Sequence, residues 1–123
     1  IVMVFPNFCD LPDEVSALES AAAVVIPVPY DLTSTWQKGA DKGPAAIIEA
    51  SHHVEFYDVG TGTEPCHRGI ATLDAVVCHD VPEILADRLD EIVGSIVTSN
   101  KLPNGSGSSR RLGAADRCAR GHP

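Results

Sequence analysis

A chain of 123 residues with 44% hydrophobic and 21% charged side chains can form one small globular domain and is too apolar to be intrinsically disordered. Its formal net charge of −8 disfavours a nucleic-acid partner, because a phosphate backbone is itself anionic, and suits a cationic ligand. No apolar run reaches the length of a membrane span, and the amino terminus lacks the pattern of a signal peptide. Four cysteines without a CxxC motif indicate a reduced, cytoplasmic chain.

The first element that the sequence predicts is a buried strand over residues 21–29. The run is short, almost wholly apolar and rich in β-branched side chains, which is typical of a strand covered on both faces in a parallel sheet. A polar loop, residues 30–42, follows it. Gly43-Pro44 then begins a helix that ends near His53, because a proline in the first helical turn loses no hydrogen bond. We expect Ile47, Ile48 and Ser51 on one side of this helix.

Two shorter segments before the next helix also show strand patterns. Residues 54–58 alternate between apolar and polar side chains, and residues 69–73 form a second short apolar run. Between them, Gly60-Thr61-Gly62-Thr63 predicts a turn. Both flanking segments are therefore expected as strands.

The clearest helix pattern covers residues 82–99. Asp80 is suited to cap this helix, and Pro82 and Glu83 suit its first turn. One apolar stripe runs along it, formed by Leu85, Leu89, Ile92, Val93, Ile96 and Val97. Lys101-Leu102-Pro103 then leads toward a further strand that the following residues do not provide. Strands that alternate with helices predict an α/β fold with parallel pairing.

The composition changes at residue 104. Residues 104–123 contain no Val, Ile, Phe, Tyr, Trp or Met, and they open with Asn104-Gly105-Ser106-Gly107. The net charge changes from −12 over residues 1–100 to +4 over residues 101–123. Such a segment buries too little apolar surface to offset the entropy of ordering its backbone. We therefore divide the chain into a folded part, residues 1–103, and an unmatched tail, residues 104–123, that is disordered or frameshifted.

The loop after the first strand is the natural place for a site, because parallel sheets bind ligands at the carboxyl ends of their strands. The candidate residues of a substrate loop are Tyr30, Asp31, Thr33, Thr35 and Trp36. The alternative is a long connection in which Tyr30 and Trp36 pack over the sheet. Gly39 and Gly43 are compatible with an anion-binding nest but are more typical of turns.

The histidine and cysteine pairs provide weaker metal hypotheses. His52 and His53 are adjacent on a helix, so their side chains point about 100° apart, which favours a surface or packing role. Cys66-His67 and Cys78-His79 form a repeated pair, but a zinc site would need all four side chains to converge. Residue types and spacing alone identify no catalytic set.

Four pieces of the sequence together resemble the amino-terminal segment of the ureohydrolase family, most closely that of bacterial agmatinases. They are the strand ending in Pro29-Tyr30-Asp31, the loop Thr33-Ser34-Thr35-Trp36, the helix opening Gly43-Pro44 and the helical Ile48-Glu49-Ala50-Ser51. Residues 8–12, 55–58 and 69–74 fit the same register, so the resemblance covers residues 5–103. It implies a three-layer αβα fold with a mainly parallel sheet, present here as an incomplete amino-terminal portion.

The resemblance also implies an activity. Intact ureohydrolases use two manganese ions to hold a hydroxide, which attacks the guanidinium carbon of a small guanidine substrate and releases urea and an amine. For an agmatinase the substrate is agmatine and the amine is putrescine, with arginase, guanidinobutyrase and formiminoglutamase as alternatives. The intact enzyme is expected to be a cytoplasmic homo-oligomer with no nucleic-acid or membrane partner.

The metal-binding motifs of that family do not appear in the chain. They are a Gly-Gly-x-His-Ser strand end, an Asp-x-His-x-Asp motif and a later Asp-x-Asp segment, and the first is due directly after Pro103. We therefore assign no catalytic residue and no metal ligand, and we expect this chain alone to bind no manganese. The hypothesis that explains the missing motif is a reading-frame shift or a sequencing error from about Asn104. The alternative is a non-catalytic truncated paralogue or an assembly partner.

Overall fold

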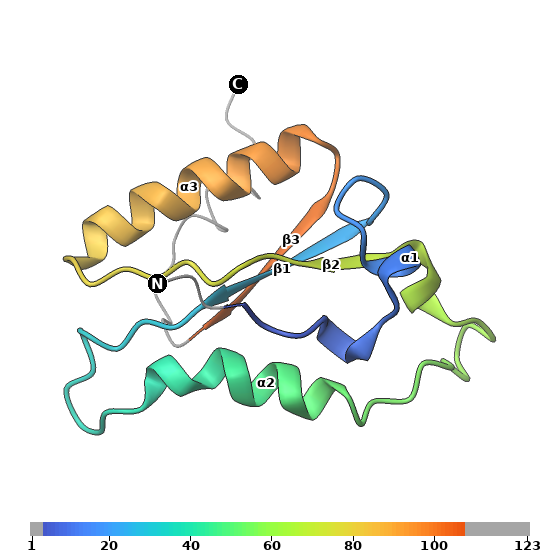
Figure 1. The fold of residues 1–123 in the computed structure, drawn as a ribbon, viewed down its shortest axis with the longest axis horizontal. Coiled ribbons are helices and arrows are strands. Elements are labelled where there is room, and N and C mark those ends of the chain that lie inside the picture. The colour runs from blue at the N-terminus through green and yellow to red at the C-terminus, as the bar shows by residue number, and fades with distance from the viewer. Residues whose placement is uncertain (1–3, 108–123) are drawn as a thin grey trace.

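A computed structural model describes residues 4–107 of the chain, and Figure 1 shows how their elements are arranged. In chain order the main elements are α1 (Asp13–Ser16), β1 (Ala23–Val28), α2 (Gly43–Ser51), β2 (Ile70–Thr72), α3 (Pro82–Thr98) and β3 (Leu102–Gly107). Short 3₁₀ helices at Phe8–Asp10, Ala40–Lys42 and Pro65–Arg68 interrupt the connections. The alternation of strands and helices confirms the predicted α/β class.

The three strands form one parallel sheet in the order β2-β1-β3. Ala23 of the central strand lies opposite Ile70 on one side and opposite Leu102 on the other. The chain continues beside β1 after β2 ends, because the Leu73 N–H donates to the Val25 carbonyl at 2.9 Å. β1 therefore has a neighbour along both edges, and five of its six side chains are buried.

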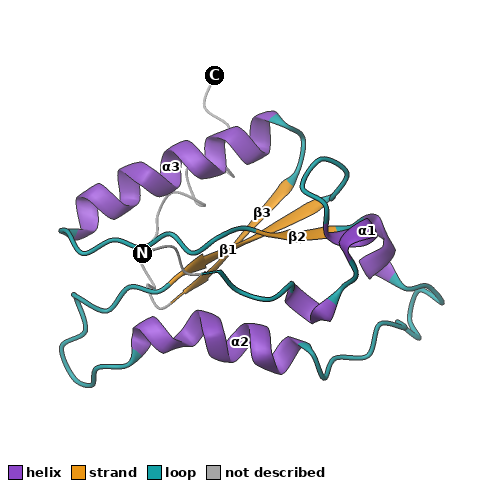
Figure 2. Cartoon of the chain, viewed as in Figure 1, coloured by secondary structure: helices purple, strands orange, loops and turns teal. Residues whose placement is uncertain are grey.

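A helix covers each face of this sheet, with α3 on one side and α2 on the other (Figure 2). Val24, Ile26 and Val28 of β1 share the main hydrophobic core with Leu85 and Leu89 of α3. On the opposite face, α2 buries Pro44, Ile48 and Ser51. The predicted αβα layering is thus confirmed, with a sheet of three strands within the described residues.

β3 contradicts the prediction that no strand follows Pro103. Leu102–Gly107 pairs in register with Ala23–Val28, although its Asn-Gly-Ser-Gly sequence has poor strand propensity. Within the described residues the buried Ser106 hydroxyl has no hydrogen-bond partner, and a Cβ added at Gly105 would meet no atom within 4 Å. Pairing with β1 therefore holds this strand, and its own side chains contribute little. The rest of the predicted tail lies outside the described residues.

Residues 54–58 do not form the predicted strand. Asp58 makes one isolated antiparallel bridge to Thr63, and the apolar side chains of the segment are exposed. Alternation indicates a strand only where a neighbouring strand supplies hydrogen-bond partners, and here none is adjacent among the described strands. The predicted turn at residues 60–63 is confirmed, since the Asp58 N–H donates to the Thr63 carbonyl at 2.8 Å.

The two predicted helices are confirmed, but each buries a narrower stripe than expected. Ile47 of α2 and Val97 of α3 are 45% and 42% exposed, because only side chains that face the sheet are covered. Asp80 does not cap α3: Val81 holds the capping position, and no side chain bonds to the helix end there. Neither these helices nor any other within residues 4–107 has the length and apolarity needed to cross a bilayer.

Candidate functional site

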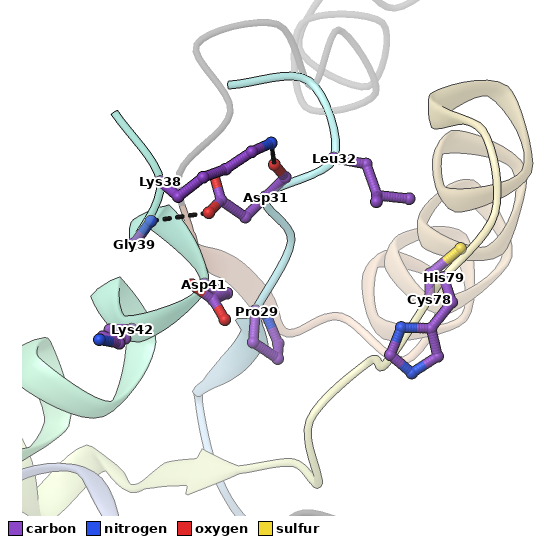
Figure 3. Close-up of a pocket in the computed structure, with 9 residues that line it drawn as sticks. All are labelled: Pro29, Asp31, Leu32, Lys38, Gly39, Asp41, Lys42, Cys78 and His79. Carbon is purple, nitrogen blue, oxygen red and sulfur yellow. Dashed lines mark hydrogen bonds between the residues drawn. The ribbon is translucent and has the colours of Figure 1, made fainter. Parts of the chain in front are cut away.

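The loop after β1 borders a cavity of about 500 Å³ at the carboxyl end of that strand (Figure 3). Its walls come from residues 29–42 and from Cys78 and His79 in the connection before α3. Two segments that are far apart in sequence meet here because β2 lies beside β1 and directs the following chain along it. The cavity lies where a parallel sheet is expected to bind a ligand.

Asp31 is the best connected of the predicted loop residues. Its Oδ2 accepts a hydrogen bond from the Gly39 N–H at 2.7 Å, and its Oδ1 accepts one from the Ser34 hydroxyl. Its backbone carbonyl accepts another from Lys38 Nζ at 2.8 Å (Figure 3). The bonds from Ser34 and Gly39 hold the pKa of the Asp31 carboxyl below its ordinary value and outweigh the opposite effect of burial.

The same contacts argue against the hypothesis that Gly39 helps to bind an external anion. This glycine has a φ of 122°, a backbone conformation that L side chains rarely adopt. Its N–H points at the carboxylate of Asp31, at 2.7 Å. The chain's own carboxylate therefore takes the place that an external anion would occupy.

The other four predicted loop residues do not line the cavity. Tyr30 is buried, and its hydroxyl donates to the Asp80 carbonyl at 2.9 Å, which ties the end of β1 to the start of α3. Burial raises the pKa of the Tyr30 hydroxyl, and the nearby Cys78, Glu83 and Asp80 add to that effect. Thr33 and Thr35 are exposed, and Trp36 is 92% exposed. A substrate contact for these residues stays a prediction.

Sequence reasoning missed four polar side chains that also line the cavity, namely Lys38, Asp41, Lys42 and His79. In Figure 3 the Asp41 carboxylate points toward Pro29, whereas the Lys42 side chain points away from it. The position of Asp41 just before the Gly43-Pro44 helix opening is the signal that would have identified it, because that helix begins at the carboxyl edge of the sheet. The sequence marked His79 only as part of a possible zinc pair, and its place in the cavity wall depends on the pairing of β2 with β1.

The described residues do not fit a centre of two manganese ions. Such a centre needs about six converging oxygen or nitrogen ligands. Within residues 4–107, no group of three or more His, Cys, Asp or Glu side chains is placed to hold a metal ion. The two Cys-His pairs are also separated, since Cys66 belongs to a small core with Cys9 whereas Cys78 belongs to the main core.

Comparison with known proteins assigns most of the described residues to one family. A sequence model of the Arginase family matches residues 21–107. The N(1)-aminopropylagmatine ureohydrolase of Synechocystis sp. is 44% identical over 55 residues, which are 45% of this chain and 18% of that protein. The protein of the same name from Thermus thermophilus is 41% identical over 58 residues, which are 47% of this chain and 20% of that protein. The chain thus spans about a fifth of the curated relatives that it matches.

Two solved structures share the fold. The agmatine ureohydrolase of Thermoplasma volcanium has a TM-score of 0.72 at 24% identity, covering 84% of this chain and 34% of that one. The formiminoglutamase of Trypanosoma cruzi, solved with Mn²⁺, has a TM-score of 0.68 at 21% identity, covering 82% of this chain and 36% of that one. The described elements therefore correspond to about a third of each of these folds.

Proposed function

The chain belongs to the arginase family, and from this premise we propose that it is the amino-terminal part of a ureohydrolase that converts a guanidine substrate of the agmatine type to urea and an amine. The observation that carries the proposal is the family match over residues 21–107. The similarity to two N(1)-aminopropylagmatine ureohydrolases supports a substrate of the agmatine type. The acidic charge balance supports a cationic substrate.

Two manganese ions are the cofactor of the intact enzyme in this proposal, on the strength of the family match and of the neighbour solved with Mn²⁺. The described residues contribute the sheet, its two covering helices and the loop beside the cavity, and not the metal ligands. The free thiols of Cys9, Cys66 and Cys78 are compatible with a cytoplasmic location. We expect the intact enzyme to be a homo-oligomer.

We also propose that the coding sequence leaves its reading frame after residue 103. Strands of parallel sheets are normally rich in Val, Ile and Leu, whereas β3 continues as Asn104-Gly105-Ser106-Gly107 and, among residues 102–106, buries only Ser106. Its buried Ser106 hydroxyl lacks a partner among the described residues. Such a conflict between local sequence and fold is unusual in natural proteins, where the two agree.

Translation of the other two frames of the DNA downstream of codon 103 tests this proposal. We expect one of them to encode Gly-Gly-x-His-Ser followed by Asp-x-His-x-Asp. If neither frame stays open, the frameshift is wrong, and a non-catalytic truncated paralogue or assembly partner becomes the better interpretation.

The 123-residue chain by itself is expected to release no urea from agmatine, N(1)-aminopropylagmatine or arginine, with or without added Mn²⁺. The physical reason is the ligand count, because the described residues place no three metal-binding side chains together. A colorimetric urea assay against a blank without protein measures this, with a complete family enzyme as the positive control. Urea above the blank would contradict the assignment of the metal ligands to sequence outside this chain.

The frame-corrected protein provides the matching positive test of the proposed function. With Mn²⁺ it is expected to release urea from agmatine or N(1)-aminopropylagmatine faster than from arginine. A corrected protein that folds and releases no urea from any of the three would show that the proposed activity is wrong.

A further inference from the structure

We propose that Asp31 is a positioning residue, whose carboxylate fastens residues 31–39 into the wall of the cavity beside β1. Asp31 then acts through the shape of the loop and does not bind a ligand itself. The inference deepens the proposed function, and it rests on that function only for the identity of the ligand that the cavity receives.

Four hydrogen bonds from three loop positions converge on Asp31, the longest being the one from the Ser34 N–H to the Asp31 backbone carbonyl at 3.4 Å. The Gly39 N–H and the Ser34 hydroxyl each donate a hydrogen bond to one carboxylate oxygen of Asp31, and Lys38 Nζ donates one to its backbone carbonyl. Bonds to an ionised acceptor are about twice as strong as those between neutral groups. Because both carboxylate oxygens are engaged within the loop, the geometry favours a role in holding the loop over a role in contacting a substrate.

Among residues 4–107, nothing else anchors the loop strongly. None of residues 32–38 is buried, and the two large apolar side chains, Leu32 and Trp36, are exposed. A segment with few buried contacts opens at low free-energy cost unless hydrogen bonds hold it. Removing the Asp31 carboxylate should therefore release the loop while the sheet and helices stay folded.

Trypsin cleavage after Lys38 measures loop opening, because proteolysis of a transiently opened segment follows the population of its open form. Asp31→Asn keeps the size of the side chain but loses one acceptor oxygen, and cleavage is expected to be roughly three- to tenfold faster than in the parent chain. Asp31→Ala loses both acceptors and should be cleaved faster still. Far-UV circular dichroism checks that each variant keeps the parent fold.

Asp41→Asn is the matched control. Asp41 lines the same cavity, and the substitution changes the net charge by the same amount. No hydrogen bond to the Asp41 carboxylate is found in the described part of the chain, so this variant should be cleaved at the parent rate. Equal cleavage of the Asp31→Asn and Asp41→Asn variants would overturn the proposal.

The pH dependence of hydrogen exchange at the Gly39 N–H provides a second measurement, which a purely packing role of Asp31 would not change. The pKa of Asp31 is lowered in the folded chain, so the protection of the Gly39 N–H should be complete above the ordinary carboxyl range and lost as the pH falls through that lowered pKa. The other charged or titratable side chains of the cavity wall are Lys38, Asp41, Lys42, Cys78 and His79. The Asp41→Asn variant should follow the parent pH profile, and the Asp31→Asn variant should show weak protection without this titration.

Parent-like protection of Gly39 in the Asp31→Asn variant would overturn the proposal. If Asp31→Ala fails to fold, Ser34→Ala removes one donor and leaves the carboxylate; it should still be cleaved faster than the parent, and a parent rate would count against the proposal. None of these measurements reads urea, so a failure of the proposed function leaves their outcome intact.

Discussion

Replacing Gly69 by alanine is expected to lower the free energy of unfolding by about 3 kcal/mol or more. Gly69 has a φ of +91°, and an added Cβ would lie 2.8 Å from Ala21 Cα and 3.3 Å from the Val15 carbonyl oxygen. Both are backbone atoms, so the chain itself must move. The Gly69 carbonyl also accepts hydrogen bonds from the Ala22 and Ala23 N–H groups at 3.1 and 3.2 Å, so this movement separates β1 from β2 where they meet.

Gly94→Ala is the control for this glycine substitution. Gly94 lies inside α3, and a Cβ there would meet no atom within 4 Å. Alanine should stabilise the helix at that position by up to about 1 kcal/mol. Urea-induced unfolding followed by far-UV circular dichroism compares the two variants with the parent chain. A Gly69→Ala variant as stable as the parent would show that the close approach of the two backbones is not required by the fold.

The helices and strands that the sequence predicted correctly are those whose secondary structure is determined by their own residues. The apolar run that contains β1 and the apolar stripe of α3 need no knowledge of their neighbours, because burial on two faces or on one is encoded in the period of the pattern. The opening of α2 is equally local, since Gly43-Pro44 suits only the first turn. Their boundaries differ from the predictions by a few residues at most.

The predictions of secondary structure were wrong where pairing with an adjacent strand determines whether a segment forms a strand. Residues 54–58 have the right alternation but lie beside no strand, whereas β3 has the wrong composition but lies beside β1. Backbone hydrogen bonding to an existing strand outweighs side-chain propensity in the second case. The patterns of the isolated segments therefore do not predict which of the two pairs with β1.

The candidate site shows the same division. The position of a strand end predicted that the following loop would border a cavity, and Asp31 does line it. The roles of single side chains did not follow from their position: Tyr30 is buried and donates to the Asp80 carbonyl, and Trp36 is exposed. His79 joins the wall only because the chain after β2 runs along β1, which is a property of the tertiary fold.

Leu85→Ala should have the second large effect, a loss of about 2–5 kcal/mol in the free energy of unfolding. Leu85 is 1% exposed and shares the main core with Val24 and Ile26 of β1, so alanine leaves a cavity between α3 and the sheet. Folded domains have a total stability of only about 5–15 kcal/mol, so this variant should unfold at a much lower urea concentration than the parent. Urea titration followed by far-UV circular dichroism measures the shift.

Ile84→Ala separates this packing effect from a change in helix propensity. Ile84 precedes Leu85 in α3 and is 40% exposed, so its truncation removes a similar volume from a more solvent-exposed part of the helix surface. The expected loss is below about 1 kcal/mol, because little apolar surface leaves the core. Equal losses in the two variants would mean that α3 does not pack on β1 through Leu85.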